Sequence, residues 1–268
     1  MKTIFLYISL WATTVAPLYA QTPQQVQQDL QAHLQHIQYW RFEYSAEDTV
    51  FKETVSQDDS IIQANKQLLA YITAKGASRQ MLQADIKLPE NSDLKITTSP
   101  DGKLRVYSWD AQTGNTTHHY YAIAQYETKT GVATTVLNDV PQPIVESTPA
   151  SGSYYDVQTI TANNGKKYYL LFSSSLGNQV TKTVSAYSID NTLSTADLFR
   201  VADKSLNTIE YTYDQAANYD FKKMKERYTI HISKQKLYVP VMDGANISGQ
   251  WLIYVWNGEQ FVFDKNAK

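Results

Sequence analysis

The chain has 268 residues, a formal net charge of −2 at pH 7 and no cysteine. The lack of cysteine excludes disulfides, thiol catalysis, zinc–thiolate sites and an acylated N-terminal cysteine. A nearly neutral chain without blocks of like charge is not typical of proteins that bind nucleic acid or anionic membranes, so we predict neither partner.

The first twenty residues have the pattern of a secretory signal peptide. Lys2 gives a basic start, residues 4–16 are largely apolar, and Ala20 offers a small residue at a cleavage point. The apolar run is too short to span a bilayer comfortably. We therefore predict a signal peptide over residues 1–20 and a mature chain, 21–268, that lies in the periplasm or outside the cell. The mature chain contains no apolar run near eighteen residues, so we predict no membrane span in it.

Two helices are predicted near the start of the mature chain. Thr22 and Gln25 fit a capping box, and apolar residues then recur at helical spacing as far as Trp40. A second helix is predicted to begin near Ser56, before two acidic residues that suit a helix N-terminus. Gly76 is a candidate for the residue just after its end. The intervening stretch, 41–55, is predicted to form an extended pair.

From residue 94 onward the pattern changes to short strands separated by turns. Tyrosine and threonine are abundant in this part, and both favour pleated, half-buried strands. Turn sequences such as Pro-Asp-Gly, Asn-Asn-Gly and Asn-Gly separate the strands, and prolines at 141, 143 and 149 form a joint. The predicted strands cover residues 94–98, 103–109, 117–126, 132–137, 154–160, 167–173, 180–188, 196–201, 207–213, 226–232, 236–241, 250–256 and 260–263.

These elements predict a single α+β domain that is mainly antiparallel β. Its helical part would span 21–90 and its β body 91–268, with two helices packed on stacked β-meander sheets. A weak internal sequence similarity supports an alternative architecture of repeats. Residues 101–107 and 164–170 both lead from a turn into an aromatic strand, which would also suit blade-like, propeller-like repeats.

Residues 99–126, SPDGKLRVYSWDAQTGNTTHHYYAIAQY, resemble a segment of uncharacterised exported β-rich proteins of gut and oral Bacteroidota-type bacteria. In those proteins two N-terminal helices also precede a β-rich body. The resemblance covers about half of the chain and is sharpest from Arg105 to Gly114. It implies an exported protein, but it brings no activity and no functional residues.

One face of the strand at 103–109 is the candidate ligand-binding surface. Arg105, Tyr107 and Trp109 share this face, and Asp110 follows at the strand end. A guanidinium beside two aromatic rings can stack a sugar or a peptide aromatic group, with the charged groups adding polar contacts. The alternative is a sheet face covered by the helices. His118 is a further candidate, but it and the adjacent histidine point to opposite faces of a strand, so they predict no metal site.

The sequence lacks the motifs of the common enzyme classes. It contains no G-x-S-x-G elbow, no H-E-x-x-H zinc helix and no glycine-rich phosphate or dinucleotide loop. We therefore predict no cofactor and no catalytic residues. The predicted function is non-catalytic binding of carbohydrate or of another envelope component. The alternatives are an exported hydrolase, whose two carboxylates come together only in the fold, and a structural envelope component.

Overall fold

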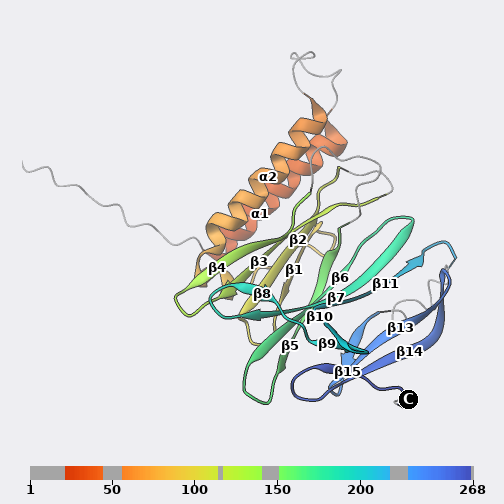
Figure 1. The fold of residues 1–268 in the computed structure, drawn as a ribbon. Helices are drawn as coiled ribbons and strands as arrows, with labels where there is room; N and C mark the ends of the chain where they lie inside the picture. Colours follow the sequence, from red (N-terminus) through yellow and green to blue (C-terminus); the bar gives the residue numbers. More distant parts are fainter. Residues whose placement is uncertain (1–21, 45–55, 114–116, 141–150, 218–228, 267–268) are drawn as a thin grey trace, which may run out of the picture.

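The computed structural model describes residues 22–44, 56–113, 117–140, 151–217 and 229–266. Helices come first along the chain and are followed by three mostly antiparallel sheets, which is the predicted α+β class (Figure 1). None of these sheets, as far as the described residues define them, closes on itself or forms propeller-like blades. The predicted signal peptide lies outside the described residues.

The helical part contains α1 (Pro23–Gln38), the π-helical turn η1 (Tyr39–Glu43), α2 (Gln57–Gly76) and α3 (Arg79–Gln83). The predicted capping box is present, since the Thr22 side chain accepts a hydrogen bond from the Gln25 backbone amide at 3.2 Å and the Gln25 side chain accepts one from the Thr22 backbone amide at 2.9 Å. The extended pair predicted over 41–55 is wrong for residues 41–43, which are helical, and its remainder from 45 onward lies outside the described residues.

Gly76 is the last residue of α2 rather than the residue after it. Its backbone is not left-handed, so the prediction of a left-handed cap at this position was wrong. The glycine is needed for space instead, because an added Cβ would lie 2.5 Å from Cγ2 of Thr134 in the sheet below. The short helix α3, which begins two residues after Ala77, was not predicted.

The first sheet has the order β1-β2-β3-β4, a simple meander. Its helix-facing side packs against α1 and α2, and its other side packs against the second sheet. Figure 1 shows the two long helices lying across this sheet. The strands are β1 (Leu94–Thr98), β2 (Leu104–Asp110), β3 (Tyr120–Glu127) and β4 (Val132–Asn138).

The second sheet has the order β11-β7-β6-β5, with β8 paired to β7. Its inner strand β6 is buried on both faces from Tyr169 to Phe172, where the sequence is continuously apolar. The short β8 was not predicted. The strands are β5 (Ser153–Thr161), β6 (Lys167–Ser174), β7 (Gln179–Ile189), β8 (Leu193–Thr195) and β11 (Thr208–Asp214).

The third sheet has the order β10-β9-β15-β14-β13-β12 and shares an apolar core with the second sheet. One pair, β15 with β9, is parallel. No helix within the described part of the chain is long and apolar enough to cross a membrane. The strands are β9 (Phe199–Val201), β10 (Lys204–Leu206), β12 (His231–Ser233), β13 (Lys236–Asp243), β14 (Asn246–Trp256) and β15 (Phe261–Phe263).

Candidate functional site

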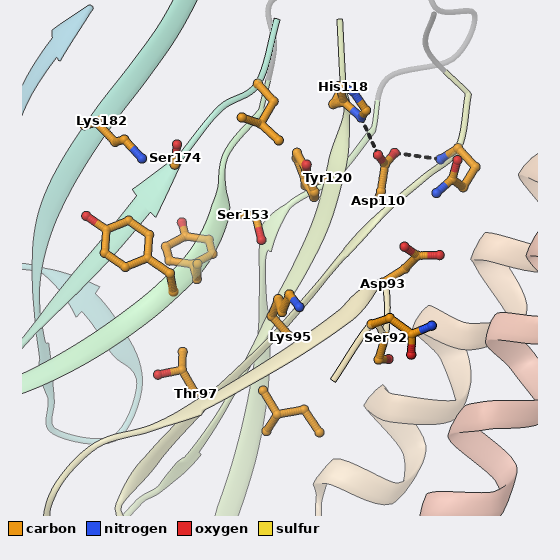
Figure 2. Close-up of a pocket in the computed structure, with 16 residues that line it drawn as sticks. Ser92, Asp93, Lys95, Thr97, Asp110, His118, Tyr120, Ser153, Ser174 and Lys182 are labelled. Atoms are coloured by element: carbon orange, nitrogen blue, oxygen red, sulfur yellow. Dashed lines mark hydrogen bonds and ion pairs between the residues drawn. The ribbon is translucent and has the colours of Figure 1, made fainter. Parts of the chain in front are cut away.

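A cleft of about 720 Å³ lies where one end of the first sheet meets the second sheet. Residues from β1, β2 and the start of β3 form one wall, and residues from β5, β6 and β7 form the other. Figure 2 shows Asp93, Asp110 and His118 on the first wall and Lys182 with Ser174 on the second. We call this the inter-sheet cleft.

Asp110 and His118 form a pair at the mouth of the inter-sheet cleft. Oδ2 of Asp110 lies 2.5 Å from Nδ1 of His118, and Oδ1 of Asp110 accepts the Gln112 amide at 2.8 Å. The His118 amide donates to the Leu176 carbonyl at 3.0 Å, which ties this wall to the turn between β6 and β7. The carboxylate therefore orients the imidazole and leaves its Nε2 as the nitrogen that a ligand can contact.

Tyr120 packs beside this pair as the first residue of β3. Its ring stacks on the His118 ring with centroids 6.2 Å apart. Burial, together with the charges of Asp110 and Asp93, raises the pKa of Tyr120 to about 12. The phenol therefore stays protonated at neutral pH and presents a hydrogen-bond donor to the cleft.

Tyr155 reaches the cleft because β5 contains a β-bulge. Tyr154 pairs with Ser173 of β6, while Asp156 pairs with Phe172, so Tyr155 is an extra residue without its own partner position. A bulge turns a side chain away from its regular direction, and here both Tyr154 and Tyr155 line the cleft. The Tyr155 residue is 39% exposed, which leaves an accessible aromatic surface.

Lys182 of β7 lies over the Tyr155 ring, with Nζ 5.5 Å from the ring centroid. Burial lowers the pKa of this ammonium group. No ion pair within the described part of the chain includes Lys182. A partly desolvated cation with only a π contact to compensate it is available to an anionic group of a ligand.

Three of the ligand-binding residues predicted from the sequence lie outside the inter-sheet cleft. Tyr107 and Trp109 are completely buried and Arg105 is 7% exposed, so they do not form the exposed surface that the sequence predicted. The alternative, a sheet face covered by helices, is what the structure has. Asp110 and His118, in contrast, both line the inter-sheet cleft.

The buried face binds the helical part to the first sheet through hydrogen bonds. Arg105 donates to the main-chain carbonyls of Met81 and Ala84, both at 2.8 Å. Trp109 donates to the Asn65 side chain of α2 at 2.9 Å. The Arg105 guanidinium makes these directed bonds because a buried guanidinium needs acceptors for its donors.

Tyr107 is held in the same way. Its hydroxyl donates to the side-chain oxygen of Gln125 at 3.0 Å. The side-chain NH2 of Gln125 then donates to the main-chain carbonyls of Gly76 and Ser78 at 2.9 and 3.0 Å. Every polar end of the predicted face therefore has a structural partner. The role of this face is to attach α2 and α3 to the sheet.

A second hollow of about 720 Å³ lies at the opposite end of the sheets, among the hairpin turns. It is lined by several cations, but most of them are already paired. Glu127 accepts from Arg79 and Lys103, and Lys166 lies 3.5 Å from Asp190. Exposed ion pairs of this kind are common on solvated hairpin turns. We therefore take the inter-sheet cleft as the candidate site.

Comparison with protein-family models, with curated proteins and with solved structures gave no match for this chain. The site is therefore interpreted from its own chemistry.

Lys182 is the cleft residue for which the sequence carried a signal that our interpretation missed. On a strand, alternate residues share a face, and the face of Lys182 also holds the buried Val180, Val184 and Ala186. A lysine in the apolar register of a strand indicates a cavity or a partner. Tyr155 had no comparable signal, because nothing in the residue pattern reveals the bulge.

Proposed function

We propose that this chain is a non-catalytic binding protein whose inter-sheet cleft holds a carbohydrate. The observation that carries the proposal is the accessible ring of Tyr155, which lines the same cleft as the Asp110–His118 pair. Sugars are bound by packing their C–H faces on an aromatic ring while carboxylates, hydroxyls and imidazoles bind the sugar hydroxyls. Asp93, Tyr120 and the serines of the cleft add such groups.

A glycan array followed by calorimetry tests this function. Tyr155→Ala removes the accessible ring, and we expect it to weaken carbohydrate binding at least about tenfold. Tyr168→Ala is the matched control. Tyr168 also carries a lysine ammonium 5.5 Å above its ring, but it lies outside the cleft. Absence of binding to any glycan, or equal loss in both variants, would contradict the proposal.

The Asp110–His118 pair favours an exported hydrolase as the second candidate. A carboxylate that orients an imidazole is the arrangement of a general base, and Asp93 places a second carboxylate in the cleft. His118→Asn separates the two functions. Loss of product formation with retained binding would establish hydrolysis, whereas a wild-type protein that binds glycans without releasing product would support binding alone.

We further propose that the protein acts after export, in the periplasm or outside the cell. The signal-peptide pattern of residues 1–20 and the lack of cysteine support this location, as does the resemblance of residues 99–126 to exported proteins. Cell fractionation tests it. The full chain should be found outside the cytoplasm without residues 1–20, and a chain expressed without those residues should stay inside.

A further inference from the structure

The charged groups that line the inter-sheet cleft are not paired evenly. Its carboxylates already have partners: Asp110 contacts His118 and the Gln112 amide, and Asp93 accepts a hydrogen bond from the Gln38 side chain at 2.9 Å. Its two lysines, Lys95 and Lys182, take part in no ion pair of the described residues. Asp93, like the lysines, has no ion pair within the described part of the chain, but its carboxylate has a hydrogen-bond partner. The two lysines are therefore the charged groups of the cleft that have neither a hydrogen bond nor an ion pair among the described residues.

Of these two lysines, Lys182 is the better placed to bind a ligand. It projects from the apolar face of β7, between the buried Val180 and Val184, and reaches the cleft over the Tyr155 ring. Such a position limits the water around the ammonium group and its freedom to move. An anion bound there would replace lost hydration with a charge-assisted hydrogen bond.

The same position would set how a sugar lies in the cleft. Tyr155 offers its exposed surface for packing against the sugar ring, and the ammonium group of Lys182 lies over the same ring, 5.5 Å from its centroid. A carboxylate attached to the sugar ring could therefore reach Lys182 while the ring stays against Tyr155. A neutral sugar would leave the ammonium group without a partner.

We propose that the ligand is an acidic saccharide, a glycan containing a uronic or other carboxylated sugar, and that Lys182 binds its carboxylate. This inference rests on the proposed carbohydrate-binding function and narrows it to one class of glycan. Specificity would then come from a half-buried cation that a neutral glycan leaves without an anionic partner.

The test is an array that prints carboxylated glycans beside their methyl esters, in which the carboxylate is replaced by a neutral group that is larger by one methyl. We expect the wild-type protein to bind the acid at least about tenfold more tightly than the ester, since a hydrogen bond to a charged group is worth this much. Lys182→Met should remove the preference and Lys182→Arg should retain part of it. Lys166→Met is the matched control and should bind like the wild type.

Each other outcome has a definite meaning. Equal binding of acid and ester, or an unchanged preference in a folded Lys182→Met variant, overturns the acidic ligand but leaves carbohydrate binding in place. Binding of neutral glycans alone also overturns the acidic ligand, whereas binding of no glycan at all overturns the proposed function itself. Circular dichroism of each variant, with Lys182→Gln as a second substitution, separates loss of binding from loss of folding.

Discussion

Two lysine–tyrosine pairs in this protein have the same distance between ammonium group and ring centroid but different surroundings. Lys166 and Lys182 each lie 5.5 Å from the centroid of a tyrosine ring, Tyr168 and Tyr155 respectively. Lys166 stands in the turn before β6 and is paired with Asp190. Lys182 stands within β7, in the inter-sheet cleft, without an ion pair in the described part of the chain.

The comparison teaches that the pairing of a charge is more informative about function than its contact with an aromatic ring. Arg105 extends the series, because it is more buried than either lysine but has acceptors for its guanidinium at Thr98, Met81 and Ala84. A buried cation with acceptors is part of the structure. A partly buried cation without them points to a ligand.

Replacement of each of the three cations by methionine should therefore have a different effect on stability. The largest is expected for Arg105→Met, because the carbonyls of Met81 and Ala84 lose their donors inside the protein. We expect the free energy of unfolding to fall by about 2–4 kcal/mol. Urea denaturation measures it, and a loss below about 1 kcal/mol would show that water replaces the guanidinium.

Lys182→Met should raise the free energy of unfolding, whereas Arg105→Met lowers it. The methionine fills similar space and removes the cost of burying an ammonium group, while the loss of the contact with Tyr155 offsets part of the gain. We expect the variant to be more stable than the wild type by about 1 kcal/mol in urea denaturation without ligand. Marked destabilisation would mean that Lys182 has a structural role, and the comparison would fail.

The stability difference between wild type and Lys182→Met should also depend on pH. Burial lowers the pKa of Lys182 in the folded protein below the value of 10.5 expected in the unfolded chain. Between these two values the unfolded chain binds more protons, so this group makes the wild type more stable as pH rises. The advantage of Lys182→Met should therefore shrink from neutral pH towards pH 10.5. Other ionisable groups cancel in the difference, and a constant advantage would contradict the burial of the ammonium group.

The smallest effect is expected for Lys166→Met. An exposed ion pair contributes little, so the free energy of unfolding should change by less than about 0.5 kcal/mol. The same denaturation experiment measures it. A larger loss would mean that the pairing of Lys166 with Asp190 stabilises the hairpin more than its exposure implies.

Much of the fold could be predicted from residue patterns. Alternation and turn sequences placed most strands within a few residues of their observed ends, because a half-buried strand imposes a period of two on its side chains. The residues at 101–107 and 164–170, interpreted as a possible repeat, form two neighbouring hairpins instead. Lys167 and Tyr169 of the second hairpin both donate to Asp101 of the first, at 3.0 and 3.2 Å.

The site was harder to predict because it depends on contacts between distant segments. Asp110 and His118 were among the predicted residues, yet their pairing required the turn between β6 and β7 to hold the His118 backbone. The aromatic face at Tyr107 and Trp109 had the composition of a binding surface, but its exposure depended on where the helices packed. Local sequence determines which side chains share a face and leaves open what covers that face.

The hydrogen bonds beneath the helices have a consequence for how this protein can vary. Arg105 and Gln125 bind main-chain carbonyls of residues 76–84, and every amino acid supplies that same acceptor. The exposed side chains of the recipient segment can therefore be exchanged while the attachment persists, whereas Gly76 is restricted by its approach to Thr134 and Met81, Leu82 and Ala84 by their burial. The side chains of Arg105 and Gln125, which donate these bonds, cannot be exchanged in this way. Mutational tolerance across this junction should be one-sided, broader at the exposed positions of residues 76–84 than at Arg105 and Gln125 in the sheet.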